Sequence, residues 1–254
     1  MKELLIESTL DGKNEPSLFH HAAENRPLLV ALHTWSYDRF NQEKVFLPIA
    51  ERLGWNLLLP EFRGPNKPSN PNCHEACCSK LAMQDIVDAV SFVSSSYGID
   101  KSKIFLIGAS GGGYMALMMA GYAPDLWNSV ASFVPITNLA HWYYENVETQ
   151  SAYHLDIKKC CFDKTPDETP EEYEKRSPVN YLENISKVRL KIFHGKFDKS
   201  VSVKHSMNFY QKLLDEYPQS RCFLEIFDGG HEMKAEAGID WFLNNSSANT
   251  SVTG

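Results

Sequence analysis

The stretch that most constrains this fold is residues 104–120. It opens with a short apolar run rich in β-forming residues, turns through the Gly-Ala-Ser-Gly-Gly segment 108–112, and continues at once into Ala, Leu and Met with helical spacing. This order predicts a strand, a tight turn and a helix. In that context Gly-x-Ser-x-Gly is typical of a nucleophile elbow, where a strained turn lifts the serine above the sheet edge and small neighbours avoid collisions.

The elbow makes Ser110 a candidate nucleophile. It also places the backbone N–H of Gly111 at a helix N-terminus, where it can face a developing oxyanion. The alternative is a glycine-rich turn that binds phosphate or only packs tightly. The stretch lacks the Gly-x-Gly-x-x-Gly spacing and the Gly-Lys-Ser/Thr ending of phosphate loops, and this favours the nucleophile.

The length and composition of the chain fit one large α/β domain. Its 254 residues are 43% apolar and 22% charged, which allows a single core, so we expect one domain spanning residues 1–254. The formal charge of −7 and the lack of basic runs argue against nucleic acid and favour a small-molecule partner. We find neither a signal peptide nor a stretch of membrane-spanning length, which predicts a cytoplasmic protein with no membrane partner. The oligomeric state is left open, a homodimer included.

Strand and helix patterns alternate along most of the chain. Weak alternation around Asp11-Gly12 predicts a pair of edge strands within residues 1–26. The other predicted strands are 28–32, 55–60, 104–107, 129–135, 188–194 and 221–227, and the predicted helices besides the elbow helix are 41–53, 79–98, 202–217 and 232–243. Strand–helix units in this order predict an α/β fold with a doubly wound, mostly parallel sheet.

Two segments depart from this rhythm. Residues 136–181 are long, contain the aromatic run 141–144 and then become acidic and proline-rich, which predicts a helical lid inserted over a site. For the acidic half of this segment, a solvated helical excursion is the alternative. Residues 244–254 are rich in Ser, Asn and Thr, and we expect a frayed tail there.

The six cysteines are too few for a disulfide scaffold in a chain of this size. Cys73-His74-x-x-Cys77-Cys78 is a candidate metal site, but no second Cys/His pair stands at a zinc-finger spacing. The prediction is therefore free thiols in a reducing compartment, with no metal and no cofactor.

Two further loops supply the partners that a serine nucleophile needs. Asp198 comes just after a predicted strand, and His231 follows the last strand through a flexible Asp-Gly-Gly segment. Position beyond a strand end favours Asp198 as the acid, and the freedom of its loop favours His231 as the base. The competing acids and bases are Asp156, Asp163, Asp228, His194 and His205. The chain order Ser, Asp, His is that of α/β-hydrolases.

Together these motifs resemble the catalytic domain of the prolyl oligopeptidase-like branch of α/β-hydrolases. The resemblance covers about residues 28–243 and rests on Gly108-Ala109-Ser110-Gly111-Gly112, His194-Gly195-x-x-Asp198-x-x-Val201, Gly229-Gly230-His231-Glu232 and the upstream Ser177-Pro178. It implies an α/β-hydrolase fold with a triad of Ser110, Asp198 and His231.

The loop after the first core strand departs from the family pattern. Where the family has His-Gly-Gly or His-Gly-x, this chain has His33-Thr34-Trp35. By position we expect the backbone N–H of Trp35 to be the second oxyanion donor, beside that of Gly111. Whether the Trp35 indole borders the site or only packs at the strand end stays open.

The resemblance also implies a reaction class. Peptidases of this branch carry a large β-propeller ahead of the catalytic domain, whereas only residues 1–27 precede the first core strand here. We therefore predict a serine carboxylesterase that acts on short-acyl, aromatic or sugar-linked esters through an acyl-enzyme intermediate. The alternatives are a small serine peptidase or aminoacyl amidase of the same branch and a non-catalytic binding domain. The residues expected to shape the substrate pocket are Tyr37, Tyr114, Trp142, Tyr143 and Tyr144.

Overall fold

The computed structural model describes residues 1–245. These residues form an eight-stranded sheet in the order β1-β2-β4-β3-β5-β6-β7-β8, and the strands from β4 to β8 run parallel. The strands are β1 (Lys2–Glu7), β2 (Asn14–His20), β3 (Leu28–Leu32), β4 (Asn56–Pro60), β5 (Ile104–Ala109), β6 (Ser129–Phe133), β7 (Leu190–Gly195) and β8 (Cys222–Phe227). The α/β-hydrolase fold with a doubly wound sheet is confirmed, including the antiparallel edge pair β1–β2.

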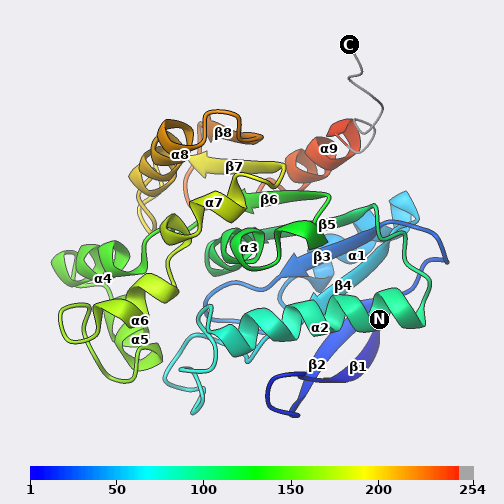
Figure 1. Cartoon of the computed structure of the whole chain (residues 1–254), viewed down its shortest axis with the longest axis horizontal. Coiled ribbons are helices and arrows are strands. Elements are labelled where there is room, and N and C mark those ends of the chain that lie inside the picture. Colours follow the sequence, from blue (N-terminus) through cyan, green and yellow to red (C-terminus); the bar gives the residue numbers. More distant parts are fainter. Residues whose placement is uncertain (246–254) are drawn as a thin grey trace.

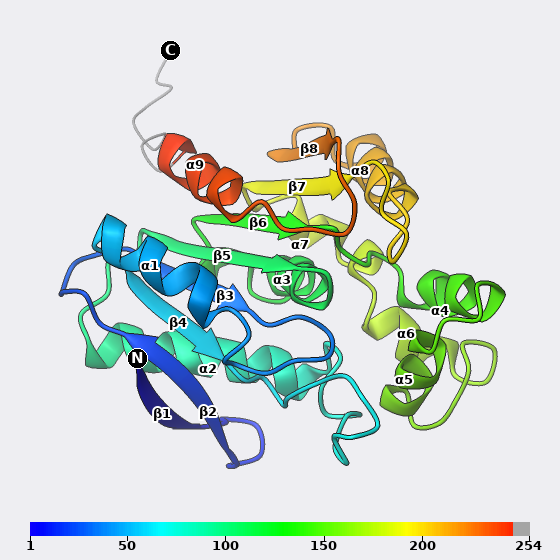
Figure 2. The same cartoon turned by 180° about the vertical axis from the view of Figure 1, so that it is seen from behind.

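Helices cover both faces of this sheet (Figures 1 and 2). One face carries α2 (Lys80–Ser96), α3 (Gly111–Tyr122) and α8 (Lys204–Glu216), and the other carries α1 (Glu43–Leu53) and α9 (Ala235–Asn245). A one-turn helix η1 (Pro124–Leu126) precedes β6, and α7 (Leu182–Ile185) precedes β7. Of the predicted tail, residues 244 and 245 belong to α9, and residues 246–254 lie outside the described part of the chain.

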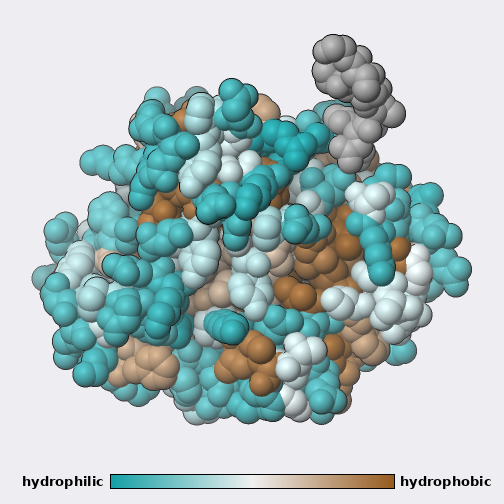
Figure 3. Space-filling view, viewed as in Figure 1, coloured by the Kyte–Doolittle hydropathy of each residue, from teal (hydrophilic) through white to brown (hydrophobic). Residues whose placement is uncertain are grey.

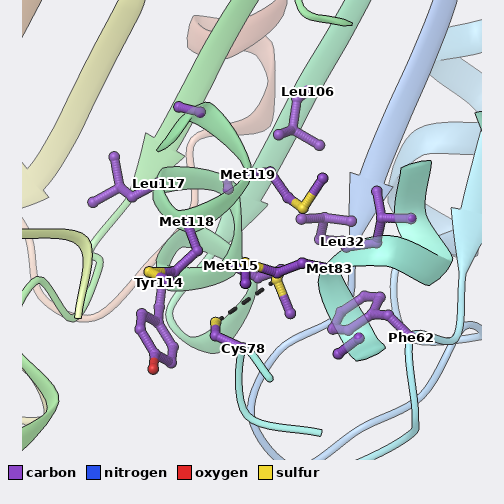
Figure 4. Close-up of a cluster of buried hydrophobic side chains, with 14 of the residues drawn as sticks. Leu32, Phe62, Cys78, Met83, Leu106, Tyr114, Met115, Leu117, Met118 and Met119 are labelled. Atoms are coloured by element: carbon purple, nitrogen blue, oxygen red, sulfur yellow. Dashed lines mark hydrogen bonds between the residues drawn. The ribbon is translucent and has the colours of Figure 1, made fainter. Parts of the chain in front are cut away.

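Alternate residues of the parallel strands supply two cores. On β5, Ile104 and Leu106 pack toward α2 and α3, whereas Phe105 and Ile107 pack toward α1 and α9. This is the period-two pattern of a strand that is buried on both faces. Figure 4 shows the first core, where methionines of α3 meet Leu32 and Leu106 and the thiol of Cys78 lies 3.7 Å from the sulfur of Met115. The sequence of α3 has no polar face, and accordingly nearly every residue of this helix is buried.

Local signals begin and end several helices. The Ser79 side chain accepts a hydrogen bond from the backbone N–H of Ala82 and caps α2, as its position before an apolar run indicates. Gly54 ends α1 in the left-handed conformation with φ of 62°. The last helix begins at Ala235 instead of the predicted Glu232, because the preceding residues form the loop that carries His231.

The inserted segment, residues 136–181, folds into short helices beyond the carboxyl ends of the strands (Figures 1 and 2). They are α4 (Leu139–Glu148), α5 (Tyr153–Cys160), α6 (Pro170–Lys175) and the one-turn helix η2 (Pro178–Asn180). The acidic half is held in place by Arg176, whose guanidinium donates 3.0 Å hydrogen bonds to the carbonyl oxygens of Ala76 and Cys77. The aromatic ring of Tyr173 is buried as well. The acidic half is therefore helical but not fully solvated.

Hydrophilic residues cover most of the face seen in Figure 3, and hydrophobic residues reach the surface in separate patches. Among residues 1–245, no helix combines the length and the apolar character needed to cross a bilayer.

Candidate active site

Ser110 lies at the turn between β5 and α3 with φ of 55° and ψ of −120°, a backbone conformation that L-residues rarely adopt. The neighbouring glycines make this turn possible. A β-carbon at residue 108 would lie 2.3 Å from the carbonyl oxygen of Gly112, and one at residue 112 would lie 2.6 Å from that of Leu32. The sequence pattern Gly-x-Ser-x-Gly is thus a steric requirement of this elbow.

Three loops at the carboxyl ends of β5, β7 and β8 bring Ser110, Asp198 and His231 into one hydrogen-bonded chain. The Nε2 atom of His231 lies 2.8 Å from the Ser110 hydroxyl, and its Nδ1 atom lies 2.7 Å from Oδ2 of Asp198. The sequence separations are 121 and 33 residues, so only the fold brings these groups together. This is the arrangement in which an imidazole can remove the proton of a serine hydroxyl.

The carboxylate of Asp198 is fixed on both of its oxygens. Oδ1 accepts hydrogen bonds from the backbone N–H groups of Ser200 and Val201 at 2.8 and 3.0 Å, and Oδ2 faces His231. Burial raises the pKa of Asp198, but hydrogen bonds from His194, His231 and the Val201 backbone outweigh burial and hold the pKa well below its ordinary value. Asp198 is therefore ionised over the whole range in which a histidine titrates.

Both competing histidines have other partners. His194 is fully buried, with Nδ1 2.7 Å from the Ser206 hydroxyl and Nε2 2.9 Å from the carbonyl oxygen of Val201. Its Nε2 also lies 3.4 Å from Asp198, so His194 supports the acid from behind. His205 pairs with Glu145 on α4.

Close backbone contact aligns the acid and histidine loops. A β-carbon at Gly195 would lie 2.0 Å from the carbonyl oxygen of Gly230, so only glycine fits at this position. The backbone N–H of Phe197 donates a 2.9 Å hydrogen bond to the carbonyl oxygen of Gly229. The two loops therefore hold Asp198 and His231 in register.

The loop after β3 brings the backbone of Trp35 against the elbow. A β-carbon at Gly111 would lie 2.5 Å from the Trp35 nitrogen. Within residues 1–245, neither of these two backbone N–H groups has a hydrogen-bond acceptor. Two unpaired donors beside a serine hydroxyl are what an oxyanion requires.

Hydrogen bonds hold the loop on both sides of the Trp35 backbone N–H. The backbone N–H of Thr34 donates to the Asn41 side chain at 3.1 Å, and the carbonyl oxygen of Trp35 accepts from Asn66 at 2.8 Å. His33 also lies 2.7 Å from the carbonyl oxygen of Glu61 through Nε2. The indole itself is buried, and its Nε1–H donates to Asp156 at 3.2 Å. The Trp35 side chain is therefore buried and bonded to α5, while its backbone N–H lies beside the elbow.

The structure corrects part of the expected substrate pocket. Tyr114 is fully buried beneath the inserted segment, and its hydroxyl donates to the backbone carbonyl of Arg176. Trp142 is also buried, and its Nε1–H donates to the carbonyl oxygen of Ser200 at 3.1 Å. Tyr143 is buried too. The hydrogen bonds of Tyr114 and Trp142 join the inserted segment to α3 and to the loop after β7, and burial leaves all three rings without surface for a ligand.

The other two predicted pocket residues are exposed. Tyr144 is 38% exposed and stands edge-on against Tyr143, and Tyr37 is 59% exposed on the loop after β3. Neither lines the cavity beside the acid loop or the one beside Asp156. Their contact with substrate therefore stays a prediction.

Two residues of α5 line cavities near the site: Tyr153, which the sequence analysis did not single out, and Asp156, which it considered only as a rival acid. Tyr153, at the start of α5, borders a cavity of about 280 Å³ that Asp198 also lines, and a second cavity of about 510 Å³. Asp156 borders the second cavity, and burial raises its pKa although the Trp35 indole bonds to it. The sequence signal available for these two residues was an aromatic residue and an acid one helical turn apart. The direction in which their side chains point depends on how α5 packs, which the sequence alone does not show.

All six cysteines are free and buried. His74, which the sequence pattern groups with three of them, lies against the ring of Phe162 at a centroid distance of 5.4 Å. The thiols of the motif Cys73-His74-x-x-Cys77-Cys78 are therefore free, as predicted.

Comparison with known proteins agrees with this geometry. Residues 78–244 match the sequence profile of the prolyl oligopeptidase family. The chain is 22% identical over 232 residues to acylamino-acid-releasing enzyme 1 of Oryza sativa, covering 86% of this chain and 29% of the relative. It is 22% identical over 202 residues to acetylxylan esterase A of Aspergillus awamori, covering 76% of this chain and 62% of the relative. The chain thus spans less than two thirds of either relative.

Solved structures share the fold. A puromycin-hydrolyzing peptidase of Mycobacterium tuberculosis superposes with a TM-score of 0.73 at 16% identity, over 95% of this chain and 37% of that one. Acylaminoacyl peptidase of Pyrococcus horikoshii superposes with a TM-score of 0.68 at 18% identity, over 93% of this chain and 38% of that one.

Proposed function

This chain belongs to the prolyl oligopeptidase family, and we propose that it is a serine hydrolase that cleaves carboxylic esters through an acyl-enzyme. The observation that carries the proposal is the hydrogen-bonded chain Ser110–His231–Asp198 at 2.8 and 2.7 Å. The two unpaired N–H groups of Gly111 and Trp35 beside it add the second requirement of acyl transfer.

In the first half of the reaction, Ser110 attacks the carbonyl carbon of the ester. His231 takes the hydroxyl proton on Nε2, and the Nδ1–H donates to Asp198, which holds the ring in the required tautomer and stabilises the imidazolium. The depressed pKa of Asp198 keeps its charge in place while His231 gains and loses a proton.

Charge then develops on the former carbonyl oxygen. The backbone N–H groups of Gly111 and Trp35 would hold this oxyanion, and losing one such donor typically costs about 3 kcal/mol of transition-state stabilisation. His231 protonates the leaving alcohol as the carbon–oxygen bond breaks. Water repeats the cycle on the acyl-enzyme, releasing the acid and regenerating the Ser110 hydroxyl.

The choice of esters rests on the relatives and on the size of the site. Among the relatives compared, acetylxylan esterase A shares a larger part of its own length with this chain than the acylamino-acid-releasing enzyme does. The cavity of about 280 Å³ beside the acid loop has room for a small acyl or sugar group next to the triad, although Ser110 itself is not among its lining residues. We therefore propose short-acyl and sugar-linked esters as the substrate class.

Matched substrates test this proposal. An ester and an anilide with the same N-acetylalanyl group are compared after each rate is divided by its uncatalysed rate in the same buffer. An esterase gives the larger enhancement with the ester and releases acetate from acetylated xylo-oligosaccharides. Ser110→Ala should abolish both activities and labelling by a fluorophosphonate. Folded wild-type protein that resists this label would be a non-catalytic binding domain.

One observation favours cleavage of aminoacyl amides as a second candidate. Asp156 offers a carboxylate at the cavity lined by Ser36, Lys67 and Tyr153, where it could pair with the free amine of an aminoacyl group. Asp156→Asn should then lower kcat/KM for alanyl anilide at least tenfold. It should leave kcat/KM for acetyl esters within a few fold, because these carry no amine.

A further inference from the structure

Outside the serine site, three side chains with metal-binding atoms converge between the inserted segment and the main fold. They are His141 and Glu145 on α4 and His205 on α8, and one ligand atom from each lies within 4.8 Å of the other two. His205 Nε2 is 3.0 Å from one Glu145 oxygen, and His141 Nε2 is 3.7 Å from the other. Tetrahedral zinc holds its nitrogen and oxygen ligands about 3.4 Å apart, and each imidazole lies near this distance from a different oxygen of the same carboxylate.

The pattern on α4 supports a shared ligand. His141 and Glu145 are four residues apart and so lie one turn above each other on the same helix face. His205 reaches this pair from α8, and its ring lies 5.0 Å from that of His141. Two neutral imidazoles attract each other only weakly. A cation bound between the two rings and the carboxylate would interact favourably with all three groups.

The surroundings of His205 are those of an oriented ligand. The residue is almost fully buried, and its Nδ1 lies 3.3 Å from the Thr137 hydroxyl. That hydroxyl donates to the His205 backbone carbonyl at 3.0 Å, and the backbone N–H of Thr137 donates to Nδ1 at 3.4 Å, so in the metal-free chain Nε2 carries the proton that faces Glu145. Metal binding at Nε2 requires the other tautomer, whose Nδ1–H the Thr137 hydroxyl oxygen can accept.

We propose that His141, Glu145 and His205 bind one Zn²⁺ ion and thereby fasten α4 to α8. Two imidazoles and a carboxylate are a frequent zinc donor set, and they leave the fourth position to water. Glu145 also lines the cavity of about 280 Å³ that borders the loop carrying Asp198. The ion would thus lie close to the acid loop without belonging to the proton relay.

The proposal predicts saturable binding of Zn²⁺ to the full chain. Titration of metal-stripped protein by calorimetry should give one site per chain, and Zn²⁺ at about a hundred times its Kd should raise the Tm by about 5–10 °C. Amide exchange in residues 139–148 should slow at the same time. These measurements need no substrate, so their outcome does not depend on whether the esterase proposal is correct.

Matched variants test whether these side chains are the ligands of the ion. His141→Ala and Glu145→Gln should each weaken Zn²⁺ binding at least tenfold. The controls Glu148→Gln on the same helix and His154→Gln on α5 should bind like wild type. The His141 side chain is 49% exposed, so its removal leaves the core intact.

Two results would overturn the proposal. One is a wild-type chain without saturable Zn²⁺ binding. The other is binding that persists in His141→Ala and Glu145→Gln but is lost in Cys160→Ser, because binding would then belong to the buried thiols. In that second case Glu145 and His205 would form only a direct hydrogen bond between the helices.

Discussion

The backbone of Gly111 lies against the backbone of Trp35, so closely that a β-carbon at residue 111 would come within 2.5 Å of the Trp35 nitrogen. This contact joins the turn after β5 to the loop after β3. It brings together two N–H groups that have no acceptor within residues 1–245. The following experiments test this contact and the groups around it.

Gly111→Ala should separate the two donors. The added methyl group must push the Trp35 loop away, and we expect kcat on p-nitrophenyl butyrate to fall by about 10²–10³ with a smaller change in KM. Gly230→Ala is the matched control, because a β-carbon there meets nothing within 4 Å. If both variants lose activity equally, or neither does, the proposed role of this contact is wrong.

Asp198→Asn should lower kcat by about 10³–10⁴ while leaving the fold intact, because an amide cannot stabilise the imidazolium of His231. Asp228→Asn, a change in the histidine loop itself, serves as the control and should stay within a few fold of wild type. Near-ultraviolet circular dichroism verifies folding. An Asp228 variant as inactive as the Asp198 variant would move the acid role to Asp228.

Tyr114→Phe should cost stability and not substrate affinity. The buried hydroxyl donates to the Arg176 carbonyl, and its loss leaves that carbonyl unpaired at a cost of about 1–2 kcal/mol. Urea unfolding should give this decrease, and KM should equal that of wild type. A raised KM with unchanged stability would indicate that Tyr114 contacts the substrate.

The acid stability of the chain should depend on Arg63. This buried guanidinium donates to Asp11 and Glu75. Its hydrogen bonds lower the pKa of Asp11, and the pKa of Glu75 is lowered first by a hydrogen bond from Lys13 and then by the one from Arg63. Groups with a depressed folded-state pKa stabilise the fold fully above their unfolded pKa of about 4 and lose that contribution as the pH falls below it. Burial raises the pKa of Glu15 nearby, which opposes part of this effect.

The measurement is urea unfolding between pH 7 and pH 3. Asp11→Asn should lower the free energy of unfolding at pH 7 by at most about 1 kcal/mol and flatten its decline toward pH 3. Asp240→Asn on the exposed side of α9 is the control and should keep the wild-type slope. An unchanged slope in the Asp11 variant would show that other groups govern acid stability.

Much of the fold was predictable because its strands are buried on both faces. Residues 28–32 are uniformly apolar and form β3 with the predicted bounds, and the elbow follows from the two glycines that flank Ser110. The order of serine, acid and histidine also indicated which loops meet, because parallel strands end at one edge.

The packing of the inserted segment was not predictable. Arg176 holds α6 through carbonyl oxygens about a hundred residues away, and no local pattern encodes such contacts. The misplacement of Tyr114 had a readable cause, since a helix without a polar face is buried all round and cannot turn one ring outward. The cluster of His141, Glu145 and His205 joins two helices far apart in the chain, so only the tertiary structure reveals it.

The hydrogen bond from the Trp142 indole to the Ser200 carbonyl ties α4 to the turn whose N–H groups hold Asp198. The positions of α4 and of the acid are therefore coupled, and a substitution that loosens the packing of Trp142 would also loosen the turn that holds Asp198.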